Sequence, residues 1–198
     1  KWPKSITIIR HGESEYNVLK GIKEKDPEYQ DFRKAFERDN KSLTTKELAE
    51  IIKEKYAVSV SDYKTPLTKQ GIEQAFLTGK RLHEQSAEQP IPDIIICSPY
   101  LRTVETLAAM QRGWADLKNV FVRHDDRIRE QDHGLALLYN DRMLFNVFHP
   151  EQKALRGLKD SYWYKFPQGE SISDVRDRIG SMITTLIREW AEKNVWLV

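Results

Sequence analysis

Four short runs of apolar residues, rich in β-branched side chains, interrupt an otherwise polar chain. Such runs are typical of β-strands, and we expect strands over residues 5–9, 93–98, 119–124 and 194–198. The first two runs are apolar at nearly every position, as in strands that a parallel sheet buries on both faces. The pattern therefore predicts a mostly parallel sheet rather than a half-exposed antiparallel one.

Two segments between these strands have the period of an amphipathic helix, residues 67–85 and 171–194. We expect Thr68 to be the N-cap of the first, and Ser171 followed by Asp174 forms a variant of the capping box at the start of the second. The apolar stripes comprise Ile72, Ala75, Phe76, Gly79 and Leu82, and then Ile172, Val175, Ile179, Met182, Ile183, Leu186 and Trp190. Alternating strands and helices predict an α/β fold, a three-layer sandwich with helices on both faces of the sheet.

Two further segments interrupt this alternation within what we interpret as a single domain, residues 1–198. Residues 20–62 are highly charged and their apolar spacing suits two amphipathic helices, so we interpret them as a helical insertion over the carboxyl edge of the sheet. Residues 135–166 form a lid-like excursion. The apolar positions of the insertion are Phe32, Phe36, Leu48, Ile51 and Ile52. For the aromatic residues of the excursion we expect a small core, with the lining of the substrate entrance as the alternative for some of them; they are Tyr139, Phe145, Phe148, Tyr162, Trp163, Tyr164 and Phe166.

Composition excludes several classes of partner. The chain has 198 residues, with 32 basic and 30 acidic side chains and a formal charge of +2, which argues against an extended nucleic-acid-binding surface. The lone Cys97 lies in an apolar run, so we expect a buried thiol and a reducing, cytoplasmic compartment. We find no signal-like start and no apolar run of membrane-spanning length, and we expect a soluble protein without a membrane partner.

Basic and titratable side chains follow the first two predicted strands. Arg10 and His11 come directly after the first, while Ser98 and Pro99 end the second and Arg102 falls in the first turn of a helix. If these two strands are neighbours in a parallel sheet, their carboxyl ends lie at one edge and these side chains should converge. Two guanidiniums, helix-start amides and an imidazole suit a tetrahedral dianion such as a phosphoryl group.

The chain also resembles a known family, in five motifs that occur in the family's order. They read RHGESEYN, TPLTKQGIEQA, CSPYLRTVETL, RIREQDHG and FPQGESISDVRDRI. Together they resemble the histidine phosphatase superfamily, branch 1, whose members are phosphoglycerate-mutase-like. The match covers most of the chain apart from about residues 20–60.

The resemblance implies a role for each of four side chains. His11 would be the nucleophile and would form a phosphohistidine that water hydrolyses. Arg10 and Arg102 would bind the phosphoryl oxygens and stabilise the charge on them in the transition state. Glu130 would be the general acid that protonates the leaving group, with Asp132 as the second choice.

Further expectations concern the substrate phosphate, metal binding and the second histidine of the family. Asn17 would donate a hydrogen bond to the substrate phosphate, and Ser14 either contacts the substrate or caps the helix that begins there. His133 and His149 lack the spaced partners of a metal site, so we expect a reaction without metal or cofactor. The family's second histidine is missing from the usual position after the last strand, and we expect it beyond Val198 in a longer polypeptide.

These inferences favour a phosphomonoester hydrolase that acts on a small phosphorylated substrate. The alternatives are a phosphoglycerate mutase and a non-catalytic module that binds phosphorylated ligands. The mutases read Glu-Arg-His-Tyr-Gly around the acid, whereas this chain reads Glu130-Gln131-Asp132-His133-Gly134 and lacks the basic residue. The substrate's identity and the oligomeric state stay open.

Overall fold

The computed structural model describes residues 1–87 and 90–198, which form two compact units. Unit 1 combines Lys1–Tyr16, Asp62–Glu130 and Asp177–Val198. Unit 2 combines Asn17–Ser61 and Gln131–Arg176. The segments interpreted as an insertion and an excursion thus belong to one unit, and the predicted strands belong to the other.

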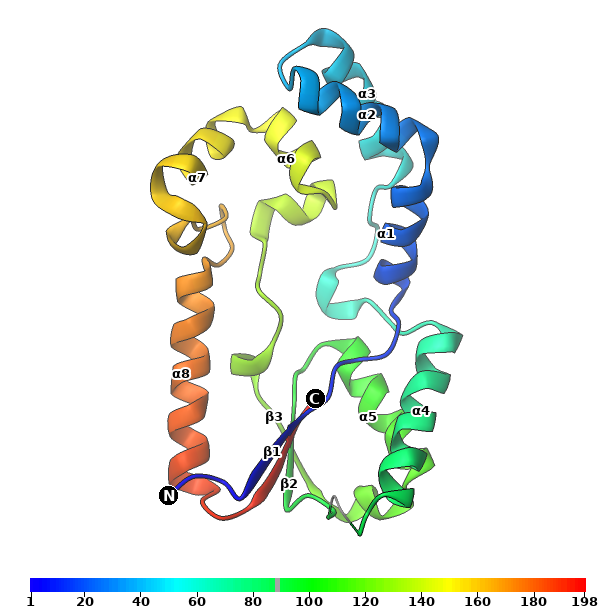
Figure 1. Cartoon of the computed structure of the whole chain (residues 1–198), viewed down its shortest axis with the longest axis vertical. Coiled ribbons are helices and arrows are strands. Elements are labelled where there is room, and N and C mark those ends of the chain that lie inside the picture. The colour runs from blue at the N-terminus through cyan, green and yellow to red at the C-terminus, as the bar shows by residue number, and fades with distance from the viewer. Residues whose placement is uncertain (88–89) are drawn as a thin grey trace. The chain divides into compact units, whose positions relative to one another are not determined.

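Within the described residues, four strands form one parallel sheet with the order β1-β4-β2-β3. The strands are β1 (Ser5–Ile8), β2 (Ile94–Cys97), β3 (Phe121–His124) and β4 (Asn194–Leu197). Helices α4 (Lys69–Glu84) and α5 (Leu101–Gly113) lie on one side of the sheet and α8 (Ile172–Glu189) on the other (Figure 1). The predicted α/β sandwich with a mostly parallel central sheet is confirmed.

Helices α4 (Lys69–Glu84) and α5 (Leu101–Gly113) cover one face of the sheet. The side chain of Thr68 accepts a hydrogen bond from the backbone N–H of Gly71, which confirms the predicted N-cap. Between these helices and the sheet, the core includes Ile95, Cys97, Leu107, Met110, Trp114 and Trp196. Cys97 is a free, buried thiol whose pKa burial raises to about 11, so it stays protonated at neutral pH.

Helix α8 (Ile172–Glu189) begins with the predicted capping box. Ser171 and Asp174 each donate a backbone N–H to the other's side chain, at 2.8 and 3.1 Å. Farther along, the helix packs against the opposite face of the sheet through Met182 and Leu186. The predicted stripe was too wide, because Ile172 and Ile183 are exposed.

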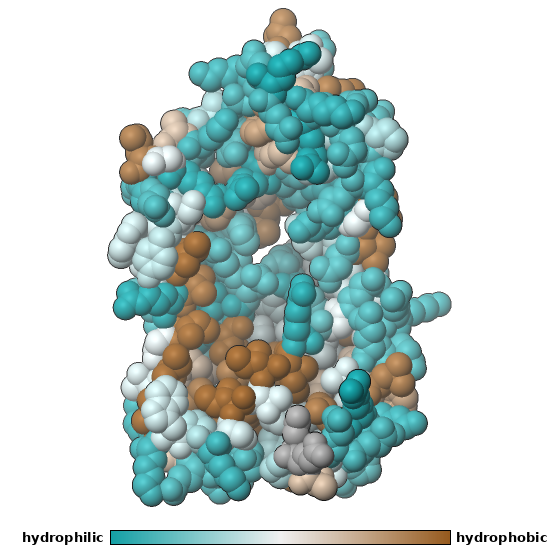
Figure 2. Space-filling view, viewed as in Figure 1, coloured by the Kyte–Doolittle hydropathy of each residue, from teal (hydrophilic) through white to brown (hydrophobic). Residues whose placement is uncertain are grey.

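The expectation that β1 is buried on both faces was wrong. Ile8 is 79% exposed and Ile6 39%, whereas every residue of β2 is buried. Ile6 and Ile8 pair in register with Val195 and Leu197 of β4, so they share the face that α8 covers. Since β1 is the edge strand, hydrophobic residues remain on the surface over β1 and α8, as Figure 2 shows.

Unit 2 is helical, and the two amphipathic helices predicted in its inserted part are present as α2 (Pro27–Arg38) and α3 (Leu43–Lys55). They come after α1 (Glu15–Lys25), the helix expected to begin near Ser14, which begins in unit 1. The excursion contributes α6 (Arg142–Phe148) and α7 (Pro150–Trp163). Shorter 3-10 helices are η1 (Asp62–Lys64), η2 (Ala115–Asn119) and η3 (Asp126–Ile128) in unit 1, and η4 (Gly134–Tyr139) in unit 2.

The inserted helices and the excursion share a hydrophobic core within unit 2. One cluster joins Phe32 and Ile52 to Leu144 of α6, and a second contains Phe145, Tyr164 and Phe166. This shared core explains how the inserted segment, which has few apolar residues of its own, folds. Two residues expected in these cores are on the surface instead, Ile51 at 47% and Trp163 at 60% exposure.

A buried ion pair links the two parts of unit 2. The ammonium of Lys23 donates to the Asp141 carboxylate at 2.9 Å and to the backbone oxygen of Asn140 at 2.7 Å. Tyr29 donates to the same carboxylate. Burial alone would raise the pKa of Asp141, but the Tyr29 hydrogen bond and the Lys23 charge bring it below its usual range. Across the described ranges, no helix combines the length and apolar character needed to cross a membrane.

Candidate active site

Three strands of unit 1 lead into the predicted catalytic residues. β1 continues through Ile9, whose N–H donates to Leu197 at 2.8 Å, directly into Arg10 and His11. β2 leads to α5, which carries Arg102 in its first turn, and β3 leads through η3 to Glu130. The neighbouring placement that the prediction assumed was wrong, because β4 lies between β1 and β2, but the parallel topology still puts the carboxyl ends of all three strands at one edge of the sheet.

A single threonine connects the segment after β1 to α5. The N–H of Gly12 donates to Thr106 Oγ1 at 3.2 Å, and the same hydroxyl donates to the backbone oxygen of Arg102 at 2.7 Å. Thr106 is 1% exposed, so water does not compete for these bonds. The histidine-bearing segment and the helix of Arg102 are thereby held in one arrangement.

Two glycines allow the same segment to lie directly on α4. A Cβ on Gly12 would stand 2.3 Å from the backbone oxygen of Gly71, and one on Gly71 would stand 2.0 Å from that of Glu13. Thr68 adds hydrogen bonds to Glu13, from its N–H to the backbone oxygen at 2.9 Å and from Oγ1 to the carboxylate at 2.8 Å. Both glycines are therefore required by backbone packing.

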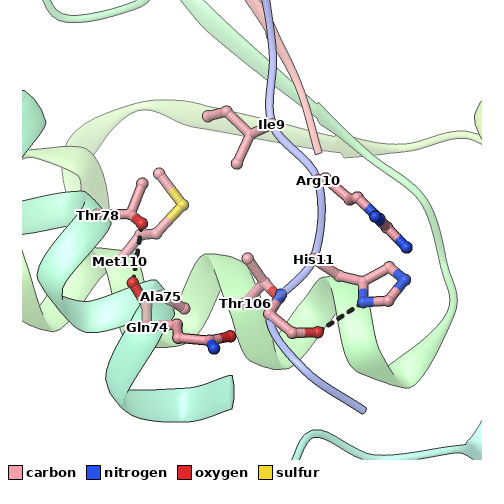
Figure 3. Close-up of a pocket in the computed structure, with 9 residues that line it drawn as sticks. Ile9, Arg10, His11, Gln74, Ala75, Thr78, Thr106 and Met110 are labelled. Atoms are coloured by element: carbon pink, nitrogen blue, oxygen red, sulfur yellow. Dashed lines mark hydrogen bonds between the residues drawn. The ribbon is translucent and has the colours of Figure 1, made fainter. Parts of the chain in front are cut away.

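The ring of His11 is held in one orientation. Its Nδ1 lies 2.7 Å from the backbone oxygen of Gly12, which can only accept, so Nδ1 carries the proton (Figure 3). In the neutral ring, Nε2 then has a free lone pair. This is the atom required of a nucleophile.

The surroundings of His11 favour its neutral form. Burial lowers its pKa below the ordinary value of 6.5, and the positive charges of Arg102 and Arg10 lower it further. The hydrogen bond to Gly12 and the negative charge of Glu130 act in the opposite direction without reversing the shift. All three predicted partners are thus close enough to His11 to act on its charge.

Arg102 is fixed by two neighbours. Its Nη1 donates to Asp62 twice, to the backbone oxygen and to Oδ1, each at 2.8 Å. The guanidinium lies over the ring of Tyr100, 4.6 Å from the centroid. Because the Arg102 side chain is only 8% exposed, these contacts leave it little freedom.

The segment that carries Glu130 is fastened to α8 by two arginines. Arg178 donates to the backbone oxygens of Arg127 at 2.8 Å and of Glu130 at 3.1 Å. Arg127 pairs with Asp125 at 2.7 Å and donates to Thr185 of α8 at 2.8 Å. Glu130 itself is exposed to solvent, as access to a substrate requires.

A cavity of about 170 Å³ adjoins the segment after β1 that carries His11, on the side of α4 and α5. Its lining includes Arg10, His11, Gln74 and Met110. In Figure 3 the side chains of Arg10 and His11 extend to one side of the chain, and Gln74 and Met110 lie on the other. The two catalytic candidates thus point away from the part of the cavity that Gln74 and Met110 line.

The remaining candidates have structural partners or stay predictions. Ser14 precedes α1, is buried and pairs with Leu67 in an isolated bridge, and Asn17 lies on α1 at the start of unit 2. Asp132 accepts the N–H of Gly134 at 2.7 Å, a local role that does not favour it as the acid. His133 packs on Phe166 and His149 bonds to Tyr139, and no group of metal-ligating side chains exists in the described residues.

Three residues that support the site were not identified from the sequence, namely Asp62, Thr106 and Arg178. Each acts through tertiary contacts that no local pattern predicts. Thr106 lies inside the motif CSPYLRTVETL, so the motif gave a signal for it. Arg178 lies inside the motif FPQGESISDVRDRI and had the same kind of signal, whereas Asp62 lies in none of the motifs.

Comparison with known proteins agrees with this geometry. Residues 52–198 match the family model described as the histidine phosphatase superfamily (branch 1). The chain belongs to this superfamily. The match includes Arg102 and Glu130, and the RHG segment precedes it.

Histidine phosphatase relatives and structures extend the comparison. The chain is 31% identical over 191 residues to the phosphoglycerate mutase-like protein AT74 of Arabidopsis thaliana and 29% identical over 194 residues to AT74H of the same plant. These alignments cover 94% of the chain but 48% and 54% of the relatives, so it spans about half of their length. A putative alpha-ribazole-5'-P phosphatase of Escherichia coli shares the fold, with a TM-score of 0.63 and 19% identity over 98% of this chain and 71% of that one.

Proposed function

We propose that the protein is a phosphomonoester hydrolase that works through a phosphohistidine on His11. The observation that carries this proposal is the 2.7 Å contact between His11 Nδ1 and the Gly12 oxygen, because it leaves Nε2 unprotonated and available. The lowered pKa of His11 keeps that atom neutral near pH 7. Membership of the superfamily, whose members include phosphatases and mutases, gives independent support.

In the first step, Nε2 of His11 attacks phosphorus, so an N–P bond forms while the ester P–O bond breaks. Arg10 and Arg102 bind the phosphoryl oxygens, where they balance the charge of the transition state. Glu130, in its acid form, gives its proton to the departing alkoxide. Products of this step are the free alcohol and phosphorylated His11.

In the second step, the Glu130 carboxylate takes a proton from water while the water oxygen attacks phosphorus. The N–P bond breaks, inorganic phosphate leaves and Nε2 regains its lone pair. The fixed proton on Nδ1 lets the ring pass through both steps without turning. Each residue returns to its starting state, and no other reactant is needed.

The decisive experiment compares His11→Ala with His124→Ala. His124 ends β3 in the same unit and is exposed, so its loss controls for removal of an imidazole. With a panel of phosphate esters and an aryl phosphate, wild type and His124→Ala should release phosphate and carry an acid-labile label on His11. His11→Ala should do neither, and a label that persists in His11→Ala would contradict the proposal.

The leaving group tests the role of Glu130. Glu130→Gln should slow alkyl phosphates by about 10² to 10⁴-fold. An activated aryl phosphate, which needs no proton, should be slowed far less. Equal slowing of both substrates would remove Glu130 from this role. Isomerisation of 3-phosphoglycerate that depends on a bisphosphate primer, without net phosphate release, would instead favour a mutase.

A further inference from the structure

The contact between Arg102 and Asp62 has features of a built arrangement. Both hydrogen bonds come from the same nitrogen, Nη1, and both end on one residue, at 2.8 Å to the backbone oxygen and 2.8 Å to Oδ1. The carboxylate and the backbone carbonyl of Asp62 therefore fix the direction of the two N–H groups on Nη1 of Arg102. Such charge-assisted bonds orient a guanidinium as well as bind it.

Burial strengthens this contact. The side chains of Arg102 and Asp62 are 8% and 25% exposed, so solvent screens the pair less than it would at the surface. The Tyr100 ring supports one face of the guanidinium, and Tyr63 packs against Tyr100 with its centroid at 5.6 Å. The plane of the guanidinium and the position of Nη1 are both determined.

The donors of Arg102 divide into two groups. A guanidinium has N–H groups on Nε, Nη1 and Nη2, and Asp62 occupies Nη1 alone. Among residues 1–87 and 90–198, neither Nε nor Nη2 of Arg102 has a hydrogen-bond partner. These two nitrogens form the edge that binds a tetrahedral oxyanion with two parallel hydrogen bonds.

The segment that presents Asp62 is itself fastened to unit 1. The N–H of Leu67 donates to the carboxylate of Glu105 at 2.7 Å, and that of Thr68 donates to Glu13 at 2.9 Å. Asp62 begins this segment, directly after the inserted helices in the chain. The partner of Arg102 is thus anchored to the same α5 and to the segment after His11.

We infer that Asp62 is a positioning residue, which holds Arg102 so that Nε and Nη2 face the substrate phosphoryl group. This inference rests on the proposed function insofar as Arg102 binds phosphate. The opposite role would be a latch, in which Asp62 competes with phosphate for the guanidinium. The two roles predict opposite signs, since loss of a positioning residue weakens phosphate binding and loss of a latch tightens it.

Calorimetric titration with inorganic phosphate tests the inference without requiring turnover. Asp62→Ala should weaken phosphate binding about tenfold, the equivalent of one charge-assisted hydrogen bond. Asp62→Asn keeps the Oδ1 acceptor and should recover part of the loss, to about threefold. Asp93→Asn is the matched control, because Asp93 is also paired, with Lys193 and the N–H of Asn194, but at the start of β2; it should bind phosphate like wild type.

A double-mutant cycle with Arg102→Lys assigns the effect to the pair. Lysine lacks the planar donors, so Asp62→Ala in this background should weaken binding by less than twofold. An equal tenfold loss in both backgrounds, or tighter binding by Asp62→Ala alone, would overturn the inference. If wild type binds phosphate with these dependences but hydrolyses no ester, the proposed function fails and the inference stands.

Discussion

The contact of Gly71 with the segment after β1 offers a sharp test of how the site is built. A Cβ at Gly71 would lie 2.0 Å from the Glu13 oxygen, about 1.4 Å short of the 3.4 Å at which contact becomes ordinary. The obstructing atom is backbone, so no side chain can rotate away. Gly71→Ala must therefore move α4 or the segment that carries His11, two residues before Glu13.

The size of the effect follows from that displacement. Overpacking costs about 1–3 kcal/mol, while replacing glycine by alanine inside a helix gains about 1 kcal/mol. Gly71→Ala should thus lower the free energy of unfolding by roughly 0–2 kcal/mol. A shift of about 1 Å at a reacting group can reduce turnover by about 10²-fold, so kcat should fall far more than stability.

Gly180→Ala provides the matched control. Gly180 also lies inside a helix of unit 1, but a Cβ there would meet nothing within 4 Å. This variant should gain about 1 kcal/mol and keep its kcat. Urea unfolding and initial rates with an aryl phosphate give the two readouts. If Gly71→Ala gained stability like Gly180→Ala and kept full activity, the reasoning from the glycine contact would be refuted.

Two further predictions concern charged groups. In an NMR titration, the pKa of His11 should lie below 6.5. It should rise in Arg102→Gln, because the charge of Arg102 opposes protonation, and fall in Glu130→Gln, because the charge of Glu130 favours it. Shifts of the same sign in both variants would contradict this. Lys23→Met should lower the free energy of unfolding by about 3 kcal/mol in urea, because it leaves a buried carboxylate unpaired. Lys20→Met, on the same helix but 57% exposed, should change it by less than about 1 kcal/mol, and equal losses would count against the buried pair.

Local sequence patterns were sufficient for much of the fold. The caps at Thr68 and Ser171 were predicted because a capping bond joins residues three apart, which a sequence displays directly. The four strands were predicted because short apolar runs rich in β-branched residues are typical of buried strands. Both kinds of inference depend on neighbours in the chain.

The wrong predictions concern burial, which depends on contacts with segments that are remote in the chain. An apolar run such as the one that ends at Ile8 does not reveal whether its strand is central or at the edge, and the order β1-β4-β2-β3 places it at the edge. Similarly, the core that the inserted helices share with Leu144 of α6 was not predicted, because Leu144 lies far along the chain. Burial is a property of the sheet order and of packing between segments, neither of which a local pattern contains.

The residues of the candidate site also fall into those that the sequence identifies and those whose role depends on tertiary contacts. His11 and Arg102 could be found because each carries chemistry and follows a strand, whereas Glu130 was found through the resemblance to the family. Thr106 could not be given a role, although its hydroxyl accepts from Gly12 and donates to the Arg102 carbonyl. That one side chain makes the two motifs a single structural unit, since displacing either end breaks a buried hydrogen bond. A residue such as Thr106 is therefore constrained by its position between the two motifs, which is why ordered motifs carry more weight than RHG alone.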